Sequence, residues 1–115
     1  MGILLISDGF RYIYYMKKVL QGKLEALNSI CKRHHVQSLH IFGSATRDEL
    51  NSNSDIDLLV KFEDFDLSDY FDNYIQLKSE LKDLFGREVD LVEEQSLRNP
   101  ILIQSINKNK SLVYG

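Results

Sequence analysis

Two aspartates separated by a single residue lead into a short apolar run of this chain. Asp55 and Asp57 flank Ile56, and Leu, Leu and Val follow directly. In an extended strand, residues i and i+2 point to the same face, so the two carboxylates would project side by side while Ile56 faces a core. Like charges held this close raise the pKa of one carboxyl group unless a cation such as Mg²⁺ is shared between them. For an isolated Asp-x-Asp pair, the simpler interpretation is a turn cap at Asp55 and a solvated strand face at Asp57.

A third acid lies in another short apolar run. Asp90 stands in the sequence Val-Asp-Leu-Val, where burial of an unpaired carboxylate would be costly. If this strand runs beside the first, Asp90 reaches the same cation site as Asp55 and Asp57. Three acids on adjacent strands can hold two metal ions ~3.5–4 Å apart, an arrangement that supports in-line phosphoryl transfer. Taken alone, Asp90 is equally compatible with an exposed strand residue.

A Gly-Ser pair precedes the first two acids. Gly43 would let the backbone approach a ligand closely, and Ser44 offers a hydroxyl group. The N–H groups of a helical turn that begins there would face phosphate oxygens, and Arg47 would counter triphosphate charge. A Gly-Ser pair alone indicates only a polar turn. The specific signal is the combination of Gly-Ser, ten residues, Asp-x-Asp and a later strand acid.

The periodicity of apolar residues predicts the elements that must position these groups. The first two strands are too close for a crossover helix, so we expect them to be antiparallel, whereas the second and third can be parallel. The fold class expected is α/β (α+β), a small mixed sheet with helices packed against it. The expected elements are helices over 17–35 and 67–85, strands over 36–44, 55–62 and 87–94, a short helix that Pro100 begins, and a C-terminal extension over 110–115 that returns to the core.

Composition indicates a single-domain protein with no membrane-spanning segment and no basic nucleic-acid-binding face. The 115 residues fit one domain, and the net charge of −3 gives no basic face for direct nucleic-acid binding. No apolar run approaches the ~20 residues that span a bilayer, so we expect no membrane partner. The single cysteine, Cys31, forms no internal disulfide and suits a reducing cytosol, where buried packing is its simplest role.

The motif Gly-Ser-x(10)-Asp-x-Asp with a third strand aspartate resembles the nucleotidyltransferase superfamily related to DNA polymerase β. The length and acidity are similar to those of the minimal nucleotidyltransferases encoded beside HEPN-domain toxins in prokaryotes. The C-terminal Asn-Pro before a helix and the final Leu-x-Tyr also resemble that family. We assign residues 16–115 to the nucleotidyltransferase domain and treat 1–15 as an extension of unassigned role. One departure is Asp48, an acid where many relatives carry glycine, which would weaken nucleotide binding.

The resemblance implies a role for each motif residue. Asp55 and Asp57 would bind two Mg²⁺ ions, and Asp90 would bind one of them and help to deprotonate the attacking hydroxyl. Gly43 and Ser44 would hold the β- and γ-phosphates. Family members of this type are cytoplasmic antitoxins that transfer AMP from ATP to a tyrosine of a HEPN ribonuclease. The resemblance therefore implies ATP as substrate, Mg²⁺ as cofactor and a HEPN toxin as partner.

Other metal sites fit the sequence poorly. A calcium loop of the EF-hand type would need glycine where Ile56 stands and glutamate where Phe62 stands. A zinc site built from His34, His35 and His40 lacks a second ligand pair at suitable spacing, so surface or helix-end histidines are the better interpretation.

Other functions remain open. A non-enzymatic module could neutralise a partner by docking alone, and a nucleotidyltransferase could instead modify a small molecule or RNA. The acidic balance disfavours RNA as the acceptor. We expect the helix over 67–85 to lie over the acid site and to contact the partner. The chain also carries many aromatic residues of the kind that interfaces favour, of which we expect half or more to be in the core. They are Tyr12, Tyr14, Tyr15, Phe65, Tyr70, Phe71 and Tyr74.

Overall fold

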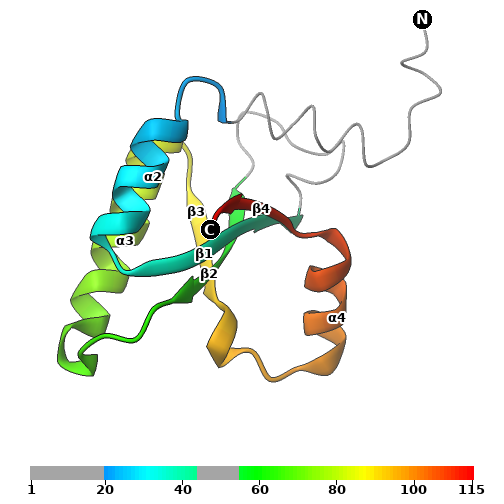
Figure 1. Cartoon of the computed structure of the whole chain (residues 1–115). Helices are drawn as coiled ribbons and strands as arrows, with labels where there is room; N and C mark the ends of the chain where they lie inside the picture. Colours follow the sequence, from blue (N-terminus) through cyan, green and yellow to red (C-terminus); the bar gives the residue numbers. More distant parts are fainter. Residues whose placement is uncertain (1–19, 44–54) are drawn as a thin grey trace, which may run out of the picture.

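A four-stranded mixed sheet in the order β3-β2-β1-β4 forms the middle of this computed structural model, which describes residues 20–43 and 55–115. Strand β1 is antiparallel to β2 and β4, while β2 and β3 are parallel, which confirms both predicted pairings. Figure 1 shows helices α2 and α3 on one side of the sheet and α4 on the other. The elements are α2 (Leu24–Arg33), β1 (Val36–Phe42), β2 (Ile56–Phe62), the 3₁₀ turn η3 (Leu67–Asp69), α3 (Tyr70–Phe85), β3 (Val89–Glu93), the 3₁₀ turn η4 (Glu94–Ser96), α4 (Pro100–Asn109) and β4 (Ser111–Tyr114).

Strand β2 is buried on both faces, as its nearly unbroken apolar sequence predicts. Leu58 and Val60 face the core that α2 and α3 cover, and both are fully buried. Leu59 points to the opposite face and is only 1% exposed. The C-terminal extension returns to this sheet as strand β4, which confirms that prediction.

The main core lies between the sheet and the pair α2–α3. Burial raises the pKa of the Cys31 thiol to about 12, so Cys31 is a packing residue rather than a reactive one. The buried members are Leu20, Leu27, Ile30 and Cys31 at the start of the described chain, Val36, Leu39, Ile41, Ile56, Leu58, Val60, Phe62, Val89 and Leu91 from the strands, and Leu77, Leu81 and Phe85 from α3.

The sequence predicts one continuous helix over 17–35, and this prediction is wrong because the helix is interrupted. A turn occupies 21–23, and α2 begins only at Leu24. Gly22 has φ +72°, a left-handed conformation that a helix interior does not permit. The glycine therefore interrupts the helix outright instead of weakening it. Residues 17–19 lie outside the described residues.

Side-chain and glycine caps set the ends of the other helices. The Asp66 carboxylate accepts a hydrogen bond from the Ser68 N–H at 3.0 Å, which lowers the pKa of that carboxyl group and begins the 3₁₀ turn that leads into α3. Gly86, at φ 65°, ends α3 as a C-terminal glycine cap. Asn99 caps α4, and Pro100 begins it as predicted. Within the described residues, none of the helices is long and apolar enough to cross a bilayer.

A buried histidine ties the end of α2 to α3. The His34 ring contacts the Asn73 Oδ1 at 3.1 Å through Nδ1, and Glu80 through Nε2. The Arg33 guanidinium donates to the other Glu80 oxygen at 2.9 Å. His34 is thus a helix-end histidine, as expected, but it is buried rather than on the surface.

We predict that Glu80→Gln lowers the free energy of unfolding by about 1–3 kcal/mol at pH 7, because the buried His34 ring loses its charged partner. The hydrogen bond from His34 lowers the pKa of Glu80 below its ordinary 4.5. The contribution of Glu80 to the free energy of unfolding is therefore complete above pH 4.5. It is lost as the pH falls through the lowered pKa of Glu80 in the folded state.

Urea unfolding of the unaltered chain and of Glu80→Gln, at pH 7 and at about pH 3, measures the difference in their free energies of unfolding. The exposed pair of Lys82 and Glu88, 2.7 Å apart, supplies the control, because Glu88→Gln should leave stability nearly unchanged. An equal loss of stability at both pH values would contradict the role given to the Glu80 carboxylate.

Candidate functional site

Asp57 and Asp90 lie side by side on neighbouring parallel strands. The register of β2 with β3 pairs Asp57 with Asp90, and the preceding pair, Ile56 with Val89, is buried in the core. Because side chains alternate along a strand, both aspartates project from the sheet face opposite to α2 and α3. Asp57 is half-buried and Asp90 is exposed. The sequence prediction that the two acids meet on adjacent strands is supported by this register.

The backbone of Gly43 lies directly against the Asp57 carboxylate. Phe42, the last residue of β1, pairs with Asp57, and Gly43 follows at φ +71°. A Cβ atom at Gly43 would come 2.0 Å from the Asp57 Oδ2. Glycine is therefore required here for a close approach within the chain itself. Gly43, Asp57 and Asp90 stand in a row across strands β1, β2 and β3.

Asp55 precedes β2 and is exposed. The Ile56 N–H donates to the Glu88 carbonyl at 2.9 Å and fixes the start of β2 beside the start of β3. Asp55 is two residues from Asp57, so alternation along an extended chain would put its side chain on the same face. Ser44 and Arg47, which we expect to contact nucleotide, and Asp48 lie outside the described residues.

The donor set at this row of residues fits a hard divalent cation bound with phosphate. Across 20–43 and 55–115, no three His, Cys, Asp or Glu side chains gather closely enough to hold an ion by themselves, so Asp55, Asp57 and Asp90 do not form the predicted cluster of three converging acids. The aspartates supply carboxylate oxygens only, which suit Mg²⁺ better than Zn²⁺. Mg²⁺ keeps several waters and is usually bound through one or two carboxylates and the phosphates of a substrate. The pair Asp57–Asp90 meets that requirement without a protein cage.

Two tyrosines that we expected at a partner surface instead hold strand β3. The Tyr74 hydroxyl donates to the Leu91 carbonyl, next to Asp90, and the Tyr70 hydroxyl donates to the Glu93 carboxylate at 2.7 Å. Burial, reinforced by the charges of Asp90 and Glu93, raises the pKa of Tyr74. Both phenols therefore stay protonated and act as donors. Their role depends on a tertiary contact that no sequence motif signals.

Helix α3 does not lie over the acid pair, which corrects our expectation. Its buried residues Leu77, Leu81 and Phe85 belong to the core cluster with Leu58 and Val60 of β2. Asp57 projects from the other face of that strand. Asp57 and Asp90 thus face the side of the sheet on which α4 lies (Figure 1).

The three histidines do not form a metal site among the described residues. His34 is bound to α3, and His35 stacks on the Phe65 ring with centroids 4.7 Å apart. His40 projects from β1, where burial and the charge of Lys110 lower its pKa against the opposing charge of Glu94. Each ring has a different environment, so the zinc alternative fails.

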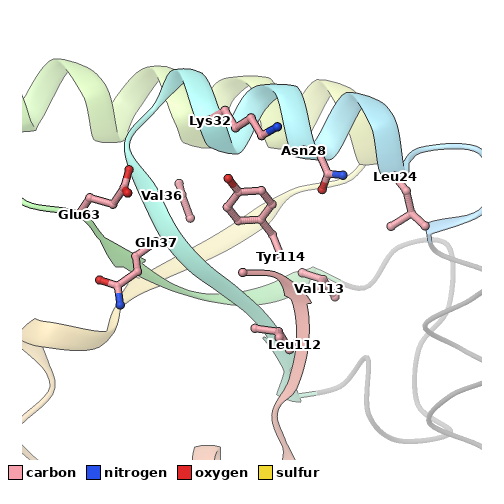
Figure 2. A pocket seen from close by; sticks show the side chains of 10 residues that line it. Leu24, Asn28, Lys32, Val36, Gln37, Glu63, Leu112, Val113 and Tyr114 are labelled. Carbon is pink, nitrogen blue, oxygen red and sulfur yellow. The ribbon is translucent and has the colours of Figure 1, made fainter.

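A separate hollow of about 620 Å³ lies between α2 and the C-terminal strand β4. Figure 2 shows Lys32, Asn28 and Tyr114 around it. None of Gly43, Asp57 and Asp90 lines this hollow. It lacks a pair of carboxylates, so the row of residues across β1, β2 and β3 remains the better candidate for phosphate chemistry.

Comparison with known proteins agrees with this geometry. Residues 25–115 match the family described as polymerase beta, nucleotidyltransferase. A Methanocaldococcus jannaschii relative named as a candidate protein adenylyltransferase is 39% identical over 83 residues, which cover 72% of this chain and 80% of that protein. The protein adenylyltransferase MntA of Thermococcus cleftensis is 35% identical over 86 residues, which cover 68% of this chain and 84% of that protein.

Solved structures show the same fold. A structure described as a candidate minimal nucleotidyltransferase superposes with a TM-score of 0.67 at 34% identity, covering 82% of this chain and 92% of that one. A crystal structure described as a toxin-antitoxin with AMP-PNP superposes with a TM-score of 0.62 at 23% identity, covering 81% of this chain and 73% of that one. The second likeness concerns the fold alone.

We predict that Gly43→Ala displaces the Asp57 carboxylate and weakens binding of Mn²⁺ in the presence of AMP-PNP by about tenfold or more. The added Cβ and the Asp57 Oδ2 cannot both keep their positions at 2.0 Å. Titration calorimetry measures the affinity.

Gly22→Ala is the matched control, because Gly22 has the same sign of φ, +72°, and a Cβ there would meet nothing within 4 Å. Both substitutions carry the left-handed backbone cost of about 1–2 kcal/mol. Only Gly43→Ala should lose ion affinity, and equal affinities for the two variants would contradict the contact with Asp57.

Proposed function

Because the chain belongs to the polymerase beta nucleotidyltransferase family, we propose that it is an antitoxin that transfers AMP from ATP to a tyrosine of a HEPN ribonuclease. The observation that carries the proposal is the row formed by Gly43, Asp57 and Asp90 across three strands. The relatives from Methanocaldococcus and Thermococcus, named protein adenylyltransferases, support the reaction and its protein acceptor. The toxin-antitoxin structures of the same fold support the class of partner.

The carboxylates would hold Mg²⁺ together with the triphosphate. Asp57 and Asp90, with Asp55 at the start of β2, are the proposed ligands of two ions. When bound, Mg²⁺ neutralises negative charge that develops on the phosphate oxygens. Gly43 and Ser44 are the proposed contacts to the β- and γ-phosphates, and Arg47 would counter the charge of the triphosphate.

The proposed transfer is an in-line displacement at the α-phosphorus. The phenolic oxygen of the partner's tyrosine forms the new P–O bond, and the bond to pyrophosphate breaks. Asp90 accepts the phenolic proton, since it is exposed beside Asp57 and can be reached from solvent. The products are AMP-tyrosine and pyrophosphate.

The charge of the chain favours a protein acceptor over RNA. Its net charge of −3 would repel an RNA backbone. Addition of AMP places an anion on the ribonuclease, and an anion close to an RNA-binding site repels the phosphates of the substrate. The reaction would occur in the cytosol, which holds both ATP and the RNA that such a toxin cleaves.

We predict that Asp55→Ala combined with Asp57→Ala reduces transfer of label from [α-³²P]ATP to the HEPN partner by about 10³-fold or more. The fold should persist, because the substitutions also remove like charges from one side of the sheet. Labelling and circular dichroism measure the two effects.

Asp83→Asn is the control, since Asp83 is an exposed acid of α3 outside the acid row. Label that still reached the partner at the original rate in the double variant would rule out the assignment of the site.

We also predict that transfer requires added Mg²⁺. Chelation with EDTA should stop incorporation of label, and excess Mg²⁺ should restore it, because the two neighbouring carboxylates and the triphosphate repel each other without a cation. Transfer that continued at full rate in EDTA would contradict the proposed metal dependence.

A further inference from the structure

Three large apolar side chains form an exposed strip along the start of α3. Leu67, Phe71 and Ile75 are four residues apart, so they lie on one side of the helix and the turn that precedes it. Their exposed fractions are 83%, 71% and 46%. Exposed apolar residues that gather in a row, rather than singly, are typical of an interaction surface. We call these three residues the apolar strip.

The strip does not contribute to the buried core. The core-facing residues of α3 are Leu77, Leu81 and Phe85, all of which are buried. The carboxylate of Asp66 caps the start of the helix, and the hydroxyl of Tyr70 ties it to Glu93 of β3. The strip is therefore presented by a fixed element, and its apolar side chains have no role in holding the fold together.

Acidic residues flank and alternate with the strip residues along the sequence, and we call them the acidic rim. Five of the ten residues from 63 to 72 are acidic, and no lysine or arginine occurs from 62 to 77. All five are exposed, and none forms an ion pair with a cation among the described residues. The rim consists of Glu63, Asp64, Asp66, Asp69 and Asp72.

The negative charge of the rim indicates which kind of protein can bind the strip. A second copy of this chain, packed strip against strip, would bring two sets of five acids together with no cation in either segment. Like charges juxtaposed across an interface cost several kcal/mol. A partner that carries both apolar and basic side chains is the complementary occupant.

We infer that the apolar strip and its acidic rim are the docking surface for the HEPN ribonuclease, an inference that rests on the proposed function. A ribonuclease binds RNA phosphates through lysine and arginine side chains, so it carries the positive face that the rim requires. The strip supplies the apolar contact that makes the complex persist.

The surface is separate from the acid site. Helix α3 packs on the face of β2 opposite to Asp57, so substitution of the strip leaves the row of Gly43, Asp57 and Asp90 intact. Loss of the strip should raise the KM for the ribonuclease while kcat at saturating partner stays unchanged. If the strip residues only stabilised the fold, their substitution would not raise KM while kcat stays unchanged.

The test uses the whole chain and its cognate HEPN ribonuclease. Leu67→Ser combined with Phe71→Ser should weaken binding by about 30-fold or more in titration calorimetry. Asp69→Asn combined with Asp72→Asn should slow association by about tenfold at low salt and reduce its salt dependence. Both pairs are exposed, and Asp66 is left in place because it caps the helix.

Ile101→Ser combined with Leu102→Ser is the matched control. These two residues of α4 are 78% and 45% exposed, so the variant removes comparable apolar surface elsewhere. The control should bind the ribonuclease as the unaltered chain does. Unfolding in urea should be the same for all variants within error, which excludes a general loss of structure.

The outcomes separate this inference from the proposed function. If the unaltered chain binds the ribonuclease and transfers AMP, while the strip variant binds equally well, the inference is overturned and the function stands. If binding depends on the strip but no AMP appears on the ribonuclease, the reaction is overturned and the docking surface stands. If the unaltered chain does not bind the ribonuclease, both are overturned.

Discussion

The register between the parallel strands β2 and β3 is the constraint on which the candidate site depends. It pairs Asp57 with Asp90, and a slip of one residue would turn Asp90 toward the core and Leu91 toward solvent. Packing opposes that slip, because Ile56 and Val89 fill the same buried layer. The Tyr74 hydroxyl, bound to the Leu91 carbonyl, holds β3 from the side of the helix. Burial of the apolar neighbours thus holds the carboxylates of Asp57 and Asp90 side by side, although their like charges repel each other.

Much of this arrangement could be predicted from the sequence because the strands have clear patterns. The short connection between β1 and β2 required an antiparallel pair, and the long helix before β3 allowed a parallel one. The break at Gly22 could not be predicted with the same clarity, since glycine within a periodic segment weakens a helix or ends it according to tertiary context. The positions of Tyr70 and Tyr74 depend on contacts across 17–23 residues, and their hydroxyl partners have no local signal.

Gly43 was expected to let a phosphate approach the backbone, and that contact stays a prediction. The structure shows a different reason for the glycine: the Asp57 carboxylate of the same chain lies where a side chain at position 43 would stand. The contributions of Ser44 and Arg47 stay predictions, since they lie outside the described residues.

Asp90 also has a consequence for the behaviour of the isolated protein. Strand β3 is at one edge of the sheet, where its outer backbone groups could pair with another chain. An exposed carboxylate within a short edge strand discourages such pairing, because two copies would bring like charges together. The proposed metal ligand therefore also protects against aggregation, and a neutral substitution at Asp90 would cost solubility.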